Sequence, residues 1–215
     1  PRAPHGAVSP DVFIGVAEEC GLIHALGAWV LETACRAAVR TGLPKLAVNV
    51  SPIQLRGEGF AAEVLRILSD TGLAPQRLEL ELTEHFHLDP GQNTRRNLHD
   101  LRMAGITIAL DDFATGQSLL QYVRDYEIDM IKIDRSFVCR LGQGDGTDEV
   151  VRAMLDLGRA MGLEVTAEGV ETAHQREILL SMGCRIFQGF LLGRPMDGNR
   201  LASLTDDRSG QPLTA

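Results

Sequence analysis

Two adjacent aspartates, Asp111 and Asp112, close the apolar stretch ITIAL at residues 106–110. Adjacent carboxylates repel each other, by about 4 kcal/mol at a separation of about 4 Å and an effective dielectric constant of about 20. A domain with a total stability of about 5–15 kcal/mol has no folding reason to place such a pair at the edge of its core. The pair therefore indicates a functional site, and carboxylate oxygens are ligands that suit Mg²⁺ or Mn²⁺.

Other polar residues share this position, because each lies at or near the end of a short apolar run. They are Asn49, Glu81, Lys132, Glu168 and Gln188, with Glu84 just after Glu81. A single lysine offsets one negative charge, so the remaining carboxylates need protons or cations. The sequence thus predicts a divalent-metal site in which the two adjacent aspartates reach two ions or bridge them.

Six β-like runs carry these residues, at 46–50, 78–82, 106–110, 130–134, 164–168 and 185–189. Amphipathic helical stretches such as FAAEVLRILSDTG and DEVVRAMLDLGRAMG lie between most of them. A repeat of strand, helix and strand is typical of a parallel sheet. The first helical stretch is expected to begin at Ser9, with Pro10 in its first turn, to break near Gly21 and to end at Gly42.

Branched apolar residues alternate with small or polar ones in these runs. In the second run, Leu80 and Leu82 alternate with Glu79 and Glu81. A strand of an open parallel sheet is apolar on both faces, whereas a barrel strand turns one face to the helices and the other to the lumen. The alternation predicts an α/β (β/α) barrel with its active site at the C-terminal ends of the strands. Glu79 would point inward one layer deeper, where a structural ion pair is expected.

The strand count is lower than a (β/α)8 barrel needs. Six runs are present, and we expect the missing strands upstream of Pro1, in a longer protein. Residues 1–204 are interpreted as a single barrel domain that is incomplete at its N-terminus, and residues 205–215 as a polar tail. The parent protein is expected to carry further upstream domains.

Composition excludes several classes of protein. The 215 residues carry a net charge of −8, which argues against binding a nucleic acid polymer, because that needs a basic face. No apolar run is long enough to insert in a membrane, and no signal peptide is evident, so a cytoplasmic domain is expected. A membrane tether through other domains of the parent protein stays open. The four cysteines have no metal-site spacing and are expected to be free thiols.

Several longer stretches resemble the EAL-domain family, the cyclic di-GMP phosphodiesterases of bacterial signalling. They are GAVSPDVFIGVAEECGLIHALGAWVL, NVSPIQL, LELELTE, DDFATGQSLL, IKIDRSFV, AEGVET and QGFLLGRPM, and they span residues 6 to 197 in the family's order. The resemblance implies a TIM-like (β/α)8 barrel whose first strand is antiparallel to the others. It also implies hydrolysis of cyclic di-GMP to linear pGpG at a site with two Mg²⁺ or Mn²⁺ ions.

The resemblance also implies roles for individual residues. Asn49, Glu81, Asp111, Asp112 and Glu168 match metal ligands, and Glu168 also belongs to the catalytic base cluster. Lys132 matches the lysine that contacts the attacking water, and Glu84 matches a glutamate that steadies the loop after the two aspartates. Gln188, Asp112 and Glu171 are expected to line the substrate site. A homodimer is expected through residues 113–127.

Two features depart from the family pattern. The Glu-Ala-Leu motif of the first strand, and the substrate-binding arginine that follows it, do not occur in this chain. Ala114 stands where the family usually has glycine. If that position needs a positive φ, alanine strains the loop by about 1–2 kcal/mol.

Alternative functions remain open on the sequence. The departures allow a catalytically inactive domain that binds cyclic di-GMP or a partner protein. A barrel enzyme acting on another phosphate ester remains if the resemblance misleads. The HFH stretch at residues 85–87 lacks a partner cluster, so a surface loop is expected there rather than a metal site.

Overall fold

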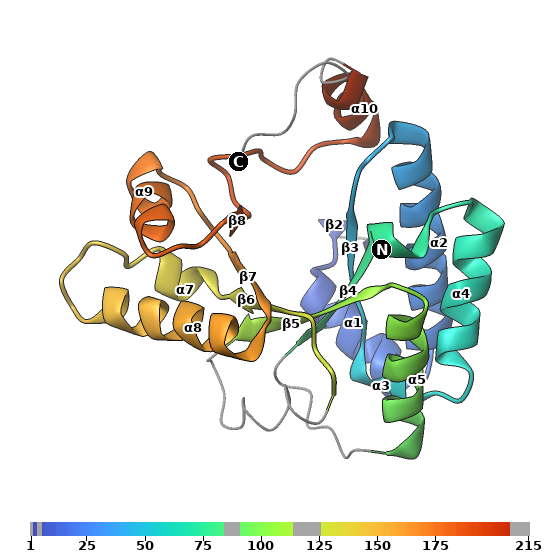
Figure 1. Cartoon of the computed structure of the whole chain (residues 1–215). Helices are drawn as coiled ribbons and strands as arrows, with labels where there is room; N and C mark the ends of the chain where they lie inside the picture. Colours follow the sequence, from blue (N-terminus) through green and yellow to red (C-terminus); the bar gives the residue numbers. More distant parts are fainter. Residues whose placement is uncertain (1, 4–5, 84–90, 114–125, 207–215) are drawn as a thin grey trace.

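The computed structural model describes residues 2–3, 6–83, 91–113 and 126–206. Figure 1 shows the elements in chain order. The strands are β1 (Arg2–Ala3), β2 (Gly6–Ala7), β3 (Leu46–Asn49), β4 (Leu78–Thr83), β5 (Thr107–Phe113), β6 (Met130–Ile133), β7 (Glu164–Ala167) and β8 (Ile186–Phe187). The helices are α1 (Pro10–Glu19), α2 (Ile23–Thr41), α3 (Pro52–Arg56), α4 (Phe60–Thr71), the 3-10 turn η1 (Pro75–Arg77), α5 (Gln92–Met103), α7 (Arg135–Val138), α8 (Thr147–Met161), α9 (Ala173–Ser181) and α10 (Gly198–Asp206).

A curled parallel sheet organises the described residues. Its six strands lie in the order β3-β4-β5-β6-β7-β8, which is also their order in the sequence, and every neighbouring pair is parallel. Helices α2, α4 and α5 flank the β3–β5 side of the sheet, and α7, α8 and α9 flank the β6–β8 side (Figure 1). All six predicted strands are confirmed.

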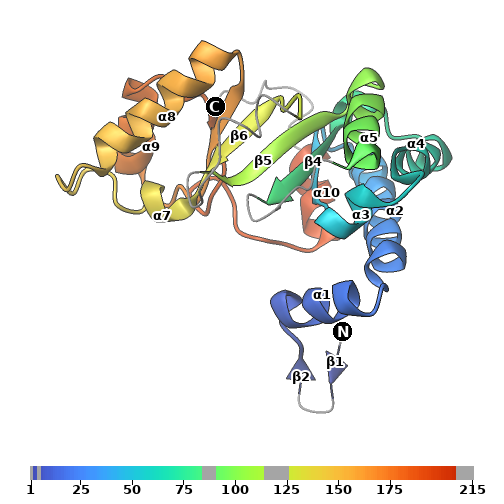
Figure 2. The same cartoon turned by 90° about the horizontal axis from the view of Figure 1, so that it is seen from below.

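The expected antiparallel first strand is not found. Each described strand of the sheet pairs parallel to its neighbour. Where the connection is described, as by α4 between β3 and β4 and by α8 between β6 and β7, a helix returns the chain to the same end of the sheet before the next strand begins. The described sheet has six strands, not the eight expected of a closed barrel. Antiparallel pairing occurs, among the described strands, between the two-residue strands β1 and β2. Figure 2 shows this hairpin and α1 projecting away from the sheet.

The strands bury their branched residues against the helices, as the alternation predicts. Leu78, Leu80 and Leu82 of β4 are at most 2% exposed, and they belong to one core together with Val64 and Ile67 of α4. Burying one such side chain contributes about 1.5–3 kcal/mol. The strand faces that pack against the helices therefore hold the strands in place. The opposite, inner faces are free to carry polar residues.

The first helical stretch divides where the sequence predicts. α1 and α2 are separated at Gly21, and α2 ends at Gly42; both glycines are left-handed, with φ of +72° and +67°. Ser9 precedes Pro10 at the start of α1, as expected, but its side chain does not cap the helix. Its Oγ instead donates to the Asp11 carboxylate at 3.4 Å.

The C-terminal part of the described chain holds a helix that the sequence analysis did not predict. α10 packs against α2 and continues to Asp206, past the expected start of the polar tail at Thr205. Residues 207–215 lie outside the described residues.

All four cysteines are free, Cys35 and Cys184 in the interior and Cys20 and Cys139 at the surface. In the part of the chain that the structure describes, no helix has the length and apolar character needed to cross a membrane.

Candidate active site

Lys132 lies among three carboxylates at the C-terminal end of the sheet. Its Nζ donates to Glu81 Oε1 at 2.6 Å, lies 3.5 Å from Asp111 Oδ1, and also forms an ion pair with Glu168 Oε1. The lysine side chain is 3% exposed, and the three acidic side chains are 8–17% exposed. One ammonium group thus joins β4, β5 and the residue that follows β7.

Among the described side chains, the acidic groups of this cluster outnumber the basic ones three to one. Burial raises the pKa of the Glu81 and Glu168 carboxyl groups, and the hydrogen bond from Lys132 to each only partly opposes this. Burial by itself would lower the pKa of Lys132, but its hydrogen bonds to Glu168 and Glu81 outweigh that and raise it. The lysine therefore stays protonated, and three carboxylates share one positive charge.

A bulge in β5 explains why two aspartates are adjacent at this point. Leu110 pairs with Ile131 and Phe113 pairs with Ile133, so Asp111 and Asp112 together stand opposite Lys132. Such an extra residue breaks the ladder locally, bends the strand and redirects the side chains beside it. The expectation that Asp112 departs from regular strand alternation agrees with this backbone. The side chain of Asp112 lies outside the description.

Asn49 lies on the neighbouring strand, in register with Glu81. Its side chain is exposed. The turn after it is held by a capping box, in which Gln54 Oε1 accepts from Ser51 N at 3.2 Å and Ser51 Oγ accepts from the Ile53 N–H. Ser51 Oγ also donates to Glu18 Oε1 of α1 at 2.6 Å. This support is absent from the sequence-based expectations, although the Ser-x-x-Gln spacing is its signal.

Gln188 directly follows β8, and Glu171 lies between β7 and α9, next to the N-cap Thr172; both are exposed. The backbone of Gln188 is fixed, because its N–H donates to Ala167 O and its carbonyl accepts from Val170 N. Glu171 donates its N–H to Gln175 Oε1 at 2.9 Å, within the capping box that begins α9. The structure thus brings Glu81, Asp111, Lys132 and Glu168 together. Asn49, Gln188 and Glu171 are exposed instead.

The deeper inward glutamate forms the structural pair expected of it. Glu79 Oε2 lies 2.8 Å from Lys45 Nζ, and the two side chains are 8% and 41% exposed. Glu84, Ala114, the HFH stretch and all but the ends of 113–127 lie outside the described residues, so the expectations for them stay predictions.

The EAL-domain family model matches residues 2–195. The chain belongs to the EAL domain family. MucR of Pseudomonas aeruginosa, described as a bifunctional diguanylate cyclase/cyclic di-GMP phosphodiesterase, is 38% identical over 203 residues, which cover 92% of this chain and 30% of MucR. This EAL chain spans 24–30% of the length of the curated relatives that it matches.

Solved structures of other EAL proteins have the same fold. The MucR phosphodiesterase in complex with cyclic di-GMP superposes with a TM-score of 0.83 at 38% identity, over 93% of this chain and 83% of that one. Klebsiella pneumoniae BlrP1, in a complex with manganese and cyclic di-GMP, superposes with a TM-score of 0.78 at 29% identity, over 90% of this chain and 50% of that one.

The donor chemistry of this EAL site suits a hard divalent cation. Its described acidic groups supply oxygen only, and three of them share the single ammonium group of Lys132. As they stand, these oxygens point at the Lys132 ammonium, and no three His, Cys, Asp or Glu side chains among the described residues are placed to hold an ion. A bound cation would therefore share these oxygens with Lys132.

Proposed function

We propose that this EAL domain hydrolyses one phosphodiester bond of cyclic di-GMP, with Mg²⁺ or Mn²⁺, and releases linear pGpG. One observation carries the proposal: three largely buried carboxylates converge on a single lysine at the C-terminal end of a curled parallel sheet. Such an excess of negative charge destabilises a fold unless a cation offsets it. Family membership supports the substrate, because the MucR and BlrP1 structures are cyclic di-GMP complexes.

The metal-binding role falls to oxygen ligands on neighbouring strands. We assign Asn49, Glu81, Asp111, Asp112 and Glu168 to a two-metal site. When bound, the two cations would lower the pKa of a water molecule and neutralise charge on the phosphate. Adjacent aspartates on a bulge suit this role, because both belong to the segment opposite Lys132.

Lys132 positions the attacking water and does not deprotonate it. Its raised pKa keeps the side chain an ammonium at neutral pH, so it can donate hydrogen bonds and cannot accept a proton. The acceptor must then be a carboxylate. Of the two glutamates that contact Lys132, Glu168 fits best, because its side chain is the more exposed, 17% against 8%, and so the more accessible to a water molecule.

Other residues are assigned to the substrate and to the surrounding loop. Gln188, Asp112 and Glu171 would line the dinucleotide, and Glu84 would steady the loop that follows the aspartates. Residues 113–127 would form a homodimer contact. We also propose that the domain is cytoplasmic and that its parent protein carries further domains upstream.

A non-catalytic receptor for cyclic di-GMP is the second candidate. It is favoured by the ion pairs of Glu81, Asp111 and Glu168 with Lys132, which engage these carboxylates without a metal ion. A receptor would bind the dinucleotide equally well in EDTA and in Mn²⁺ and would release no product.

The deciding experiment is hydrolysis of cyclic di-GMP, with pGpG followed by chromatography in Mg²⁺, in Mn²⁺ and in EDTA. It uses this chain, a form extended upstream in its parent protein, and Glu81→Gln as the control. Metal-dependent pGpG formation that Glu81→Gln abolishes supports the phosphodiesterase. Calorimetric binding of the dinucleotide without product from either form would replace it with the receptor.

A further inference from the structure

Arg102, near the end of α5, joins two acidic residues at the N-terminal ends of the strands, which is the opposite end of the sheet from the active site. Its Nε and Nη2 donate to Asp129 Oδ1 at 2.9 and 2.7 Å, and its Nη1 donates to Glu127 Oε2 at 2.9 Å. The arginine side chain is one-third exposed, so solvent only partly screens these contacts. Arg102 therefore ties α5 to the chain that leads into β6.

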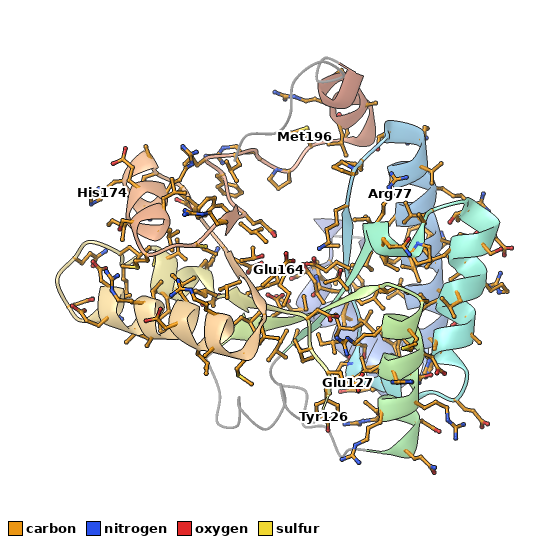
Figure 3. All side chains as sticks on the ribbon, in the orientation of Figure 1. Arg77, Tyr126, Glu127, Glu164, His174 and Met196 are labelled. Atoms are coloured by element: carbon orange, nitrogen blue, oxygen red, sulfur yellow. The ribbon has the colours of Figure 1, made fainter. Side chains whose placement is uncertain are left out.

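Asp129 is the point at which three elements meet. Its Oδ2 accepts from Ile108 N of β5 at 2.9 Å, and its own N–H donates to Ile108 O at 3.0 Å. Its carbonyl accepts from Glu164 N at the start of β7. Figure 3 labels Glu164 and Glu127, which lie at this end of the sheet, Glu127 beside α5. Asp129 thus sets how the first residue of β6 aligns with β5.

β6 needs such an anchor because its pairing with β5 is broken next to Lys132. The strand has four residues, and Lys132 is the third. The bulge lies between the Leu110–Ile131 and Phe113–Ile133 pairs, so no regular ladder to β5 holds Lys132 itself. On the β5 side, the alignment of Lys132 then depends on the pairs below the bulge, and the Asp129 contacts with Ile108 begin that series. On the other side, Lys132 pairs regularly with Thr166 of β7, and the contact of the Asp129 carbonyl with the Glu164 N–H begins that ladder too.

Glu127 adds a second sign that this junction is held in place. It has a φ of +50°, a left-handed conformation that residues other than glycine rarely adopt. Such a conformation persists only where surrounding contacts maintain it. The Arg102 guanidinium supplies one through Nη1, and His99 Nδ1 lies 3.6 Å from the same carboxylate oxygen.

We propose that Arg102 is a positioning residue: by holding Asp129 and Glu127, it fixes the register of β6 below the bulge and so keeps Lys132 between Glu81 and Glu168. The described contacts of the Arg102 side chain are with Asp129 and Glu127 and include none of Glu81, Asp111, Lys132 and Glu168. Its effect on catalysis rests on the proposed function, whereas its effect on the position of Lys132 does not.

Amine labelling tests the position directly, because the chain has only two lysines, Lys45 and Lys132. We would compare acetylation rates of the two in one sample, by peptide mass spectrometry, for wild type, Arg102→Gln and the control Arg66→Gln. Arg66 pairs with Asp70 at 2.6 Å on the exposed face of α4. Labelling of a buried amine requires local opening, so Arg102→Gln should raise the Lys132/Lys45 ratio about threefold or more. The control should leave the ratio unchanged.

Two results of this labelling would overturn the proposal. One is a ratio in Arg102→Gln equal to that of wild type. The other is an equal rise at both lysines, because it would show general loosening of the fold instead of displacement of β6.

Kinetics with cyclic di-GMP provide the second readout. Arg102→Gln should lower kcat about three- to tenfold with KM unchanged, since substrate contacts stay intact while Lys132 is misplaced. Arg102→Lys, which keeps the charge but cannot reach both acidic residues with a planar fork, should recover part of kcat. An unchanged kcat in an active protein would overturn the proposal. If wild type itself makes no pGpG, the proposed function fails, and the labelling ratio alone decides the role of Arg102.

Discussion

The two lysines of the chain lie on the inner side of the same sheet, and their surroundings differ in charge. Lys45 precedes β3, is 41% exposed, and pairs with Glu79. Lys132 is 3% exposed and is shared by three carboxylates. Their main partners, Glu79 and Glu81, are two residues apart on one face of β4 and are equally buried. The strand therefore carries two equally buried glutamates in different surroundings. Glu79 is paired with one lysine, whereas Glu81 shares its lysine with two other carboxylates.

This difference separates a structural ion pair from a functional site. A balanced, partly exposed pair contributes about 0–1 kcal/mol and needs no further ligand. A buried excess of carboxylates costs stability, and folding alone gives no reason to retain it. Four substitutions and a change of pH test the distinction, beginning with the substitution expected to have the largest effect.

Replacing Lys132 with Met should have the largest effect. The three carboxylates lose their only described cation, so the unfolding free energy without added metal should fall by about 3 kcal/mol at neutral pH. Turnover of cyclic di-GMP should fall by about a thousandfold. Urea unfolding and pGpG chromatography measure the two effects. Stability equal to wild type would show that the carboxylates do not depend on the lysine.

Glu81→Gln and Glu79→Gln form the matched pair on β4. We expect the first to reduce kcat by at least about a hundredfold, because it removes an oxygen ligand and a contact of Lys132. The second should change kcat by less than about threefold, since Glu79 contacts Lys45 instead. Equal losses of activity in the two variants would contradict the separation of the two environments.

Changing pH should move the stability of the cluster in a defined direction. Burial raises the pKa of Glu81 and Glu168 above the ordinary value of 4.5, so the folded chain retains protons that the unfolded chain has released. Stability without metal should therefore fall as pH rises above 4.5 through the raised pKa values. The raised pKa of Lys132 adds stability that is lost only at alkaline pH, above that window.

Urea midpoints in EDTA, from pH 5 upward, measure this slope. Mn²⁺ should flatten it by compensating the ionised carboxylates, and Glu81→Gln should reduce it because one titrating group is gone. A midpoint that rises across this range in EDTA would contradict the assignment of raised carboxyl pKa values.

Lys45→Met should have the smallest effect. Its pair with Glu79 is half open to water on the lysine side, so loss of stability should stay below about 1 kcal/mol and kcat should be unchanged. The same urea and chromatography assays apply. A loss of stability comparable to that of Lys132→Met would mean that the Lys45–Glu79 pair and the Lys132 cluster act as one charged network.

The sequence predicts the sheet well because its signal is local and repeated. All six strands appear in the alternation of residues such as Leu80 and Glu81, and even the structural role of Glu79 follows from its place one layer deeper. The antiparallel first strand was expected from the resemblance and not from the residues, and the described sheet does not contain it.

Parts of the candidate site depend on information that no short window of sequence holds. The bulge at Asp111 and Asp112 is a shift of register between β5 and β6, and periodicity gives no measure of such a shift. The Arg102–Asp129 contact spans 27 positions between a helix end and a strand start. Ser9 has the residue type and position of a helix cap, but its hydroxyl donates to the Asp11 carboxylate and does not cap the helix.

The order of the strands also says when this site can form. Because strand order follows sequence order, neighbouring strands can pair as each successive unit folds, with modest loop-closure entropy. The Lys132–Glu81 contact, however, joins residues 51 positions apart on strands that are not adjacent, and so requires β4, β5 and β6 already in place. The complete charge cluster, which includes Glu168 after β7, can therefore assemble only once β4 to β7 lie side by side. Substitutions in it should speed unfolding while leaving the folding rate nearly unchanged.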